Sequence, residues 1–576
     1  MRSVGGNRRY TESVFQREMQ ERGTMDYRKN QLIELDITDL GSEGEGIGRT
    51  GAFLWFVKGA LPGDRVRASV MKLKKSYGYA RLQELLRKSP DRVAPPCPVA
   101  ASCGGCSLQA LRYEAQLKFK EQKVLGNLRR IGGLELSGVQ LHPIIGMKQP
   151  FRYRNKAQFP VGTGRDGRPT AGFYAGRTHS IIPCEDCLLG VEENAEIRRC
   201  VLRWMEECGV PAYDEQSGKG FLRHILVRKG FQSGEMMVCL VTNGECCGEN
   251  SALQLLSERL MKLPAVTTVV QNINTERSNV ILGKKTQLLA GAGVIRDRIG
   301  STEFLISAQS FYQVNPVQTE RLYATALSYA GLSGRETVWD LYCGIGTISL
   351  FLARSARKVY GVEIIPQAIE DARRNAARNG ITNAEFFVGK AEEVLPRQYE
   401  ETRERADVIV VDPPRKGCDE QCLATMLRMA PERIVYVSCD SATLARDLKY
   451  LLADGCYTLR ELQMVDMFPQ TVHVEVITLL SKLDSKRHIN VDLPIDEMDL
   501  TSVESKATYK QIQNYILEKF GLKVSTLYIA QVKRKYGLEV REHYNISKNE
   551  NQKVLQCPIE KEEAILDALK YFHMIK

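Results

Sequence analysis

The sequence of 576 residues has no uninterrupted apolar run close to the ~18 to 20 residues that a membrane-spanning helix needs. Its opening stretch, MRSVGGNRRYTESVFQREMQERGTM, contains basic residues but no apolar core followed by a cleavage site, so it does not resemble a secretory signal. Internal repeats are also lacking. These absences argue against membrane and secreted classes and predict a cytoplasmic protein without a membrane partner.

Composition predicts several folded domains. The chain is 43% hydrophobic and 26% charged, a balance that excludes collagen-like and wholly disordered classes. At roughly 100 to 200 residues per domain, this length predicts about three to five domains. Lys and Arg number 80 against 69 Asp and Glu, and the resulting net charge of +11 suits a polyanionic partner.

Cysteine is plentiful, with sixteen residues in the chain. In a reducing compartment, clustered cysteines more often bind metal or take part in catalysis than form disulfides. The cysteines therefore predict reduced thiols with chemical roles at a few positions.

Pattern changes along the chain predict five parts. Residues 1–28 are polar and read as a flexible leader, and residues 29–90 show short strands separated by Gly turns, which predicts a small OB-like β-barrel. Residues 91–305 form a Cys-rich loop and a mixed α/β region, and residues 306–483 alternate buried strands with helices, which predicts a Rossmann-like doubly wound parallel sheet. Residues 484–576 read as a polar linker followed by a small, mainly helical appendage.

Two stretches have the composition of nucleic-acid contacts. One basic stretch of the barrel is interleaved with aromatic residues that could contact RNA phosphates and stack on bases, although a solvated strand face fits equally well. Its residues are Lys72, Lys74, Lys75, Tyr77, Tyr79 and Arg81. The appendage reads as helix, turn, helix, with Lys533, Arg534 and Lys535 on the second helix, which fits either a helix-turn-helix module or an ordinary helical bundle.

A nucleoside-cofactor site is predicted where a strand leads into DLYCGIGTISL. Gly344 and Gly346 allow a ligand to approach backbone N–H groups at the start of a helix, although the full G-x-G-x-x-G pattern is absent. The next strand, VYGVEII, ends near Glu363, which is well placed to accept both ribose hydroxyls of an adenosine. The two elements together favour a nucleoside cofactor over a structural turn.

Two further strands predict a thiol and two carboxylates at the same sheet edge. Asp412 is the first residue of DPPRKGCD and directly follows an apolar strand, and Cys439 lies at the end of the strand in IVYVSCD. Glu475 ends MFPQTVHVE. A buried Cys at a strand end is commonly a small hydrophobic residue. Beside a cofactor turn and a carboxylate, however, a thiolate is the nucleophile that covalent catalysis requires.

Six motifs occur in an order that resembles the RNA uracil-5-methyltransferase family, closest to the iron–sulfur-containing 23S ribosomal RNA enzymes. They are ISAQSFYQVNPVQTERLY, DLYCGIGTISL, GVEI, DPPRKGCD, YVSCDSATLARDL and DMFPQTVHVE. The resemblance covers residues 31 to about 483. It implies a TRAM-type RNA-binding barrel and the cofactor S-adenosylmethionine, and it places Gln313, Tyr342, Glu363 and Asp412 around that cofactor.

The same resemblance implies the chemistry. Cys439 would add to C6 of uracil, C5 would then take the methyl group, and Glu475 would remove the C5 proton so that Cys439 is expelled. The target base must be swung out of its RNA context. Because the thiolate is the active form, we expect Cys439 in a locally positive site, with Arg446 as a contributor.

Cys97, Cys103 and Cys106 have the spacing C-x5-C-x2-C. Four thiolates could bind zinc or a four-iron cluster, and spacing does not separate the two. The family implies a 4Fe-4S cluster and places the fourth ligand at Cys187 of IIPCEDC, with Cys184 as an extra thiol. The other ten cysteines are interpreted as packing or incidental residues: Cys200, Cys208, Cys239, Cys246, Cys247, Cys343, Cys418, Cys422, Cys456 and Cys557.

The resulting hypothesis is methylation of uridine C5 in 23S ribosomal RNA, with transfer RNA uridine as the nearest alternative and no DNA partner expected. Arg415 stands where amino-group methyltransferases usually carry an aromatic residue after Asp-Pro-Pro, which disfavours exocyclic amines, and no Cys follows Pro as in RNA cytosine-C5 enzymes. Asp440-Ser441 replaces the Asn-Pro that the family commonly carries after the nucleophile. A rival of another class is a noncatalytic RNA-binding or ribosome-assembly factor.

Overall fold

The computed structural model describes residues 27–176, 178–245, 252–402, 404–483, 509–522, 524–536, 557–572 and 574–575. Contacts divide the chain into two compact units, 1–484 and 485–576. Nearly all of the predicted leader, the predicted linker around 484–508, and both Cys246 and Cys247 lie outside the described residues. Within the described residues, no helix combines the length and the apolar character needed to cross a bilayer.

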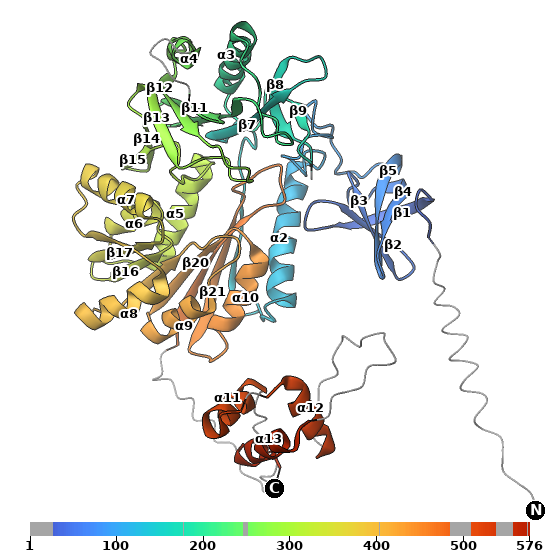
Figure 1. Cartoon of the computed structure of the whole chain (residues 1–576), viewed down its shortest axis with the longest axis vertical. Helices are drawn as coiled ribbons and strands as arrows, with labels where there is room; N and C mark the ends of the chain where they lie inside the picture. The colour runs from blue at the N-terminus through green and yellow to red at the C-terminus, as the bar shows by residue number, and fades with distance from the viewer. Residues whose placement is uncertain are drawn as a thin grey trace, which may run out of the picture. The chain divides into compact units, whose positions relative to one another are not determined.

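The first part of the first unit is a closed barrel with strand order β1-β2-β3-β5-β4, as the alternation predicted (Figure 1). Its strands are β1 (Leu32–Leu40), β2 (Gly46–Thr50), β3 (Phe53–Lys58), β4 (Arg65–Leu73) and β5 (Tyr77–Arg87). Burial alternates along β1 because successive side chains of a strand point to opposite faces. Trp55, Val57 and Val66 fill the barrel and are completely buried.

The second part is a seven-stranded sheet with the order β13-β12-β11-β10-β7-β8-β9. Its strands are β7 (Lys156–Thr163), β8 (Pro169–Tyr174), β9 (Ile181–Pro183), β10 (Leu222–Lys229), β11 (Met236–Thr242), β12 (Val266–Ile273) and β13 (Lys285–Gly291). Helices α3 (Glu193–Cys208) and α4 (Ala252–Met261) pack on it through a core that includes Trp204 and Leu256. A hairpin of β14 (Ile295–Ile299) and β15 (Thr302–Ile306) follows.

The third part is an eight-stranded sheet with the order β18-β17-β16-β19-β20-β22-β21-β6. Strands β16 to β20 are parallel, and β22 runs antiparallel to β20. The strands are β6 (Gln140–Ile145), β16 (Thr337–Leu341), β17 (Lys358–Glu363), β18 (Ala384–Val388), β19 (Val408–Val411), β20 (Arg433–Ser438), β21 (Tyr457–Val465) and β22 (Glu475–Lys482). The predicted doubly wound sheet is confirmed.

Helices cover both faces of this third sheet. Val338 belongs to one hydrophobic cluster and its neighbour Trp339 to the other, which places packed cores on opposite faces of β16. The helices are α5 (Pro316–Ala330), α6 (Thr347–Ala353), α7 (Pro366–Arg378), α8 (Ala391–Thr402), α9 (Glu420–Met429) and α10 (Ser441–Leu451). Because both faces are buried, ligands can reach the sheet at its strand ends.

Two elements of this third part come from much earlier in the chain. Helix α2 (Tyr113–Arg130) packs against α10, and β6 pairs with β21 at the sheet edge. The division expected at residue 305 therefore does not separate the elements that build this sheet. No local signal in the sequence of β6 could show which strand it would pair with.

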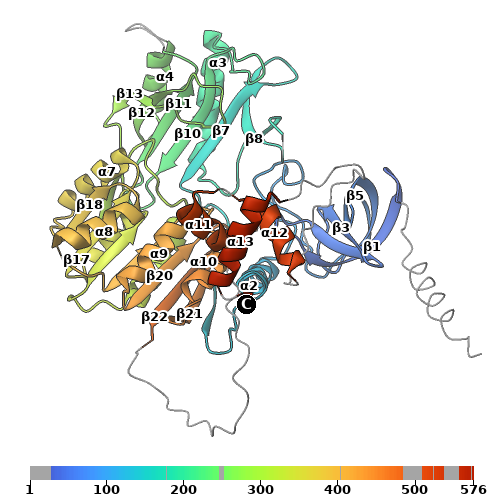
Figure 2. The same ribbon diagram turned by 60° about the horizontal axis from the view of Figure 1, so that its bottom comes forward.

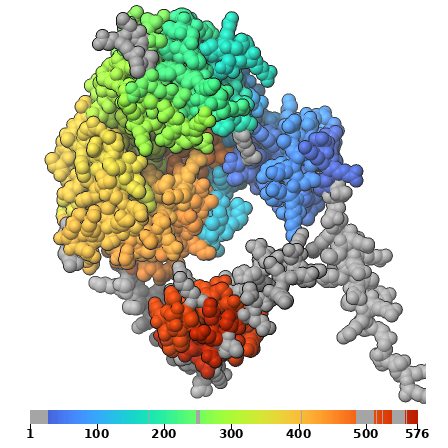
Figure 3. Space-filling model, viewed as in Figure 1, coloured from blue at the N-terminus to red at the C-terminus, as the bar shows by residue number. Residues whose placement is uncertain are grey.

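The second unit is a small helical body with its own core (Figures 2 and 3). Its helices are α11 (Tyr509–Phe520), α12 (Thr526–Lys535) and α13 (Ile559–Tyr571), and its core includes the fully buried Ile512, Ile529 and Ile565. The predicted helix, turn, helix order is present in α11 and α12. Lys533 is buried, and Lys535 pairs with Glu562, so the three basic residues do not form one continuous exposed face.

Candidate active site

Five of the sequence-predicted residues lie at one edge of the third sheet. Tyr342, Asp412 and Cys439 directly follow the parallel strands β16, β19 and β20, and Glu363 is the last residue of β17. Glu475 is the first residue of β22, and because β22 is antiparallel its beginning lies at the same edge. Open α/β sheets hold their ligands at this edge.

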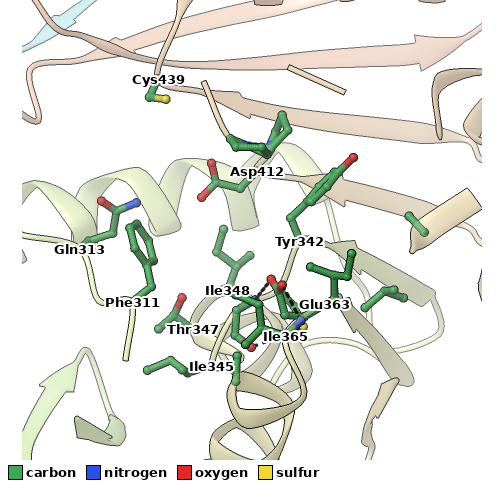
Figure 4. A pocket seen from close by; sticks show the side chains of 18 of the residues that line it. Phe311, Gln313, Tyr342, Ile345, Thr347, Ile348, Glu363, Ile365, Asp412 and Cys439 are labelled. Atoms are coloured by element: carbon green, nitrogen blue, oxygen red, sulfur yellow. Dashed lines mark hydrogen bonds between the residues drawn. The ribbon is translucent and has the colours of Figure 1, made fainter. Parts of the chain in front are cut away.

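A cavity of about 940 Å³ occupies this edge and is lined by all five residues together with Gln313. Its volume lies in the range of small-molecule sites. Figure 4 shows Asp412 between Cys439 at one end and Glu363 at the other. The cavity thus has a thiol end and a carboxylate end, joined by Asp412.

The Glu363 end has the features of a nucleoside site. The Glu363 carboxylate accepts hydrogen bonds from the backbone N–H groups of Gly344 (3.3 Å) and Ile365 (3.1 Å). A carboxylate has about four lone-pair positions, so acceptors remain for two ribose hydroxyls. Ile364 and Ile365 are exposed apolar side chains that line the same end and offer a surface for a base.

The turn after β16 has unusual backbone geometry. Tyr342 has a φ of 67° and Gly344 a φ of 56°. The left-handed region is uncommon for a residue with a side chain and is held only where surrounding structure determines it. Burial, together with the neighbouring Cys422 and Cys418 thiols, raises the pKa of Tyr342, so its phenol stays neutral. The turn thereby holds a neutral aromatic side chain against the cavity.

The ionisable groups at the thiol end of the cavity hold their protons more tightly than usual. Burial raises the pKa of Cys439 to about 12, and the nearby Glu475 and Asp412 add to this effect. Burial also raises the pKa of Glu475 to about 8, with a further contribution from Asp412. The expectation of a locally positive site for Cys439 is therefore wrong for the protein without substrate, because two carboxyls and desolvation outweigh the nearby cation.

That cation is Arg415, whose charge lowers the pKa of both Cys439 and Glu475. The predicted contributor, Arg446, is engaged elsewhere. Its guanidinium bonds to the Asp447 carboxylate and to the carbonyl oxygens of Lys416 and Cys418. Arg415 therefore takes the place that the sequence interpretation gave to Arg446.

The cavity residues that were not singled out as site residues from the sequence include Phe311, Arg415 and His473. Phe311 is 68% exposed, which is unusual for such a large apolar side chain beside a cavity. The pKa of His473 is lowered by burial and by Arg415, Lys123 and Lys120, so its imidazole is neutral. Position within the motifs was the available signal, since Phe311 lies two residues from Gln313 and His473 two residues from Glu475.

The segment before Glu475, residues 466–474, is here called the catalytic loop. Side chains of α2 and of the residue that caps the start of α5 hold its backbone: Lys120 bonds to the Phe468 carbonyl at 3.1 Å, and Asn315 bonds to the Met467 carbonyl at 3.0 Å. The Lys120 ammonium also pairs with Asp466, and both side chains are completely buried. Helix α2 is thus a direct support of the loop that ends at Glu475.

Replacing Lys120 by methionine should destabilise the first unit by about 3 to 5 kcal/mol, because it leaves Asp466 as a buried charge without its cation. The urea midpoint of the full-length protein measures the effect. Lys118→Met is the matched control, since Lys118 is an exposed lysine of the same helix. Equal midpoints for the two variants would contradict the structural role of this ion pair.

Five cysteines line a second pocket of about 320 Å³: Cys97, Cys103, Cys106, Cys184 and Cys187. Within the described part of the chain, no three His, Cys, Asp or Glu side chains are gathered in the geometry of a bound metal ion. Arg154 and Lys156 line the same pocket. Basic side chains beside several thiols fit a pocket that would hold an anionic metal–thiolate group.

Cys184 and Cys187 differ within this pocket. Cys184 acts as a donor to Cys187, which lowers the pKa of Cys187 and raises that of Cys184. Backbone N–H groups of Leu189 and Gly190 also favour the Cys187 thiolate. Of the two, Cys187 is therefore the thiol whose environment favours a ligand thiolate.

On the outside of the barrel, Phe56, Tyr77 and Tyr79 form an aromatic cluster with ring centroids 5.6 to 5.8 Å apart. All three are partly exposed, and the lysines of the basic stretch, Lys72, Lys74 and Lys75, are exposed. Exposed rings beside ammonium groups are the composition of a surface that stacks bases and contacts phosphates. Phe56 was not included when the barrel surface was predicted.

Comparison with known protein families gives two matches. Residues 28–82 match the TRAM domain, and residues 234–483 match the family described as tRNA (Uracil-5-)-methyltransferase. The first match coincides with the barrel, and the second contains every residue of the sheet-edge cavity named above.

Bacterial relatives extend the likeness over most of the chain. An uncharacterized RNA methyltransferase of Halalkalibacterium halodurans is 51% identical over 78% of this chain and 97% of its own length. One from Bacillus cereus is 50% identical over 81% of this chain and all of its own. The crystal structure of a Pyrococcus abyssi tRNA (uracil-54, C5)-methyltransferase with S-adenosyl-L-homocysteine superimposes with a TM-score of 0.62 and 28% identity, covering 78% of this chain and 100% of its own.

Proposed function

Because this chain belongs to the RNA uracil-5-methyltransferase family and uses S-adenosylmethionine to methylate RNA, we propose that it methylates C5 of a specific uridine in 23S ribosomal RNA. The observation that carries the chemistry is the meeting of Cys439 and Glu475 in the cavity whose other end is Glu363. The cysteine pocket favours ribosomal RNA, because the motifs resemble the iron–sulfur-containing enzymes that act on it.

The Glu363 end would hold S-adenosylmethionine, which supplies an electrophilic methyl group when bound. Glu363 would accept the ribose hydroxyls, and Tyr342, Gln313 and Asp412 would line the path toward the thiol end. This order directs the methyl group toward the place where a base meets Cys439. Phe311, exposed at the rim, offers a ring on which the flipped base can stack.

Cys439 activates the uracil. C5 is too weak a nucleophile to attack a sulfonium methyl, so the Cys439 thiolate adds to C6 and makes C5 electron-rich. The thiol proton must leave first, and the neighbouring Asp412 carboxylate accepts it, so that Glu475 stays ionised for the later removal of the C5 proton. Arg415 stabilises both the thiolate and the negative charge that develops on the uracil oxygens.

Glu475 completes the reaction. After C5 has gained the methyl group, the carboxylate removes the remaining C5 proton, and the electron pair expels Cys439 from C6. The side chain is 3% exposed, so water is largely excluded from the proton transfer. The product is 5-methyluridine, Cys439 leaves as a thiolate that recovers its proton from Asp412, and Glu475 releases the C5 proton to solvent.

The methylation rate should increase with pH. Glu475 must be ionised to act as a base, and burial raises its pKa to about 8, so the ionised fraction grows between about pH 7 and 9. Single-turnover transfer of labelled methyl groups to RNA measures the rate at each pH. A rate that is flat or falls over this interval would contradict the assignment of Glu475 as the base.

We also propose a 4Fe-4S cluster held by Cys97, Cys103, Cys106 and Cys187. A zinc ion needs four ligands at about 2.0 to 2.3 Å from one point, whereas a four-iron cluster takes one thiolate at each separate iron. The four thiols line one pocket, and the resemblance of the motifs to the iron–sulfur-containing enzymes favours the cluster over zinc. The cluster would order these segments, and the proposed reaction needs no electron transfer.

Iron and sulfide analysis of anaerobically purified protein should find about four of each per chain, with visible absorption typical of such clusters. Cys187→Ser should lower the iron content, whereas Cys184→Ser should retain it because Cys184 is the hydrogen-bond donor of the pair. Cys200→Ser is the control outside the pocket. Zinc without iron would contradict the cluster.

Mapping 5-methyluridine in ribosomal and transfer RNA of a deletion strain tests the substrate. Loss of a methyl group from 23S ribosomal RNA, restored by the purified enzyme, supports the proposal. Loss from transfer RNA alone would favour the alternative suggested by the Pyrococcus abyssi likeness. Unchanged methylation in both RNAs, with altered ribosome assembly, would favour a noncatalytic role.

A further inference from the structure

The cysteine pocket and the active-site cavity share a wall. Val314 lines the cysteine pocket, and its neighbour Gln313 lines the active-site cavity. Asn155 holds this wall, because its backbone N–H donates to the Val314 carbonyl and its side chain to the Gln313 carbonyl, both at 2.9 Å. The two cavities are therefore joined on the cofactor side.

A second connection reaches the catalytic loop. The backbone N–H groups of Ser107 and Leu108, which directly follow Cys106, both donate to the Gln470 carbonyl, at 3.1 and 3.0 Å. Gln470 lies in the loop that ends at Glu475, five residues before the base. One carbonyl thus fixes the catalytic loop to the segment that carries three of the pocket cysteines.

The Gln470 side chain makes the connection specific. Gln116 of α2 donates to the Gln470 amide oxygen at 3.0 Å, and its own amide oxygen accepts from the Gln470 backbone N–H at 3.1 Å. The same Gln116 amide nitrogen also reaches the carbonyls of Leu108 and Leu111. The two glutamines are 1% and 3% exposed. Buried amides with all of these partners hold three segments in one geometry.

Gln470 also has a φ of 69°, in the left-handed region that costs of order 1 to 3 kcal/mol for a residue other than Gly. Such a backbone persists only where its surroundings determine it. Here the surroundings are α2 and the segment after Cys106. Loosening that segment therefore frees the catalytic loop to leave this conformation.

We propose that Gln470 is a positioning residue, which together with Gln116 transmits the order of the cysteine pocket to the catalytic loop and so to Glu475. The inference rests on the proposed function for the role of Glu475, but the physical link between pocket and loop does not depend on it. The order of the cysteine pocket then affects the rate of the chemical step, and not only the binding of RNA.

Gln470→Asn tests the link, because Asn tolerates the left-handed conformation but its shorter amide cannot keep the Gln116 contact. We expect kcat to fall by about 100-fold while KM for RNA and for S-adenosylmethionine stays within about twofold. Gln463→Asn is the control, since Gln463 is another buried glutamine that bonds to two backbone carbonyls outside the link. An equal loss in the control, or a rise in KM without a fall in kcat, would overturn the proposal.

Hydrogen exchange of residues 466–474 gives a readout that needs no activity. In the full-length protein, Cys106→Ser should speed exchange in this segment, and Gln470→Asn should do the same. The variant that carries both substitutions should exchange little faster than Gln470→Asn alone. Unchanged exchange in Cys106→Ser, or fully additive effects, would show that the pocket and the loop are independent. If methylation proves absent while this pattern appears, the proposed function fails and the link stands.

Discussion

Replacing Cys439 by alanine should reduce 5-methyluridine formation by roughly 10⁴-fold or more, because the variant has no thiol at the end of the cavity where the base would bind. Among the described residues, the other thiol that lines the cavity is Cys343, which is buried on the cofactor side. The rate of methyl transfer to RNA in a single turnover measures the loss. Covalent capture gives a second measurement. With RNA that carries 5-fluorouridine, C5 has no proton to lose, so the wild-type protein should remain bound through Cys439 in a denaturing gel and the variant should not.

Binding controls separate this loss of chemistry from loss of fold. Cys439→Ala should bind S-adenosylmethionine and RNA with affinities close to those of the wild type, since Glu363 lies at the opposite end of the cavity from the thiol and the aromatic cluster belongs to the barrel. Cys456→Ala removes an exposed thiol outside the cavity and should leave the rate unchanged. Formation of 5-methyluridine by Cys439→Ala at a rate near that of the wild type would show that the nucleophile is another group.

Replacing Glu475 by glutamine should stop turnover and should also accumulate a covalent enzyme–RNA adduct on ordinary RNA. Addition of Cys439 and methylation of C5 do not require this carboxylate to take the C5 proton, whereas expulsion of the thiol does. The expected loss in multiple turnover is roughly 10³-fold. A slowly migrating band in a denaturing gel, which carries both labelled methyl and RNA, identifies the adduct.

The structure favours this variant as a probe. The carboxyl of Glu475 is buried beside Asp412, and both groups have raised pKa values, so a neutral amide of the same shape fits a site that already prefers an uncharged group. Glu432→Gln is the control, since Glu432 is an exposed carboxylate just before β20, at the end of that strand opposite Cys439. Release of methylated RNA by Glu475→Gln without an adduct would assign the base to another residue.

Much of the catalytic part was readable from the sequence, because the information was local. A short run of apolar residues indicates a buried strand, and the Gly, Asp or Cys that follows it shows which residue stands at the strand's end. Parallel strands bring those ends to one edge of the sheet. Glu363, Asp412 and Cys439 were placed by that rule alone. Glu475 was harder, because it begins an antiparallel strand, and its position at the same edge depends on the direction of β22.

Other features could not be read locally. Cys439 was expected in a positive environment, but its proton affinity depends on burial and on Asp412 and Glu475, which come from two other strands. Arg446 was favoured because it follows Cys439 in a helix, whereas Arg415 reaches the thiol from the loop after β19. The pKa of a group depends on its burial and on all the charges near it in space, and the spacing of residues along the chain does not reveal either.

The sequence by itself determined the parts: the barrel, the doubly wound sheet, the residues at the strand ends and the cysteines that share a spacing. Those features follow from hydrophobic period and from motifs a few residues long. The tertiary structure decided how the parts work together. It brought α2 and β6 across more than 300 residues to the catalytic sheet, as the contacts of Gln116 with Gln470, 354 residues apart, show. Such contacts depend on the packing of whole elements, and packing is a property of the folded chain and not of any segment of it.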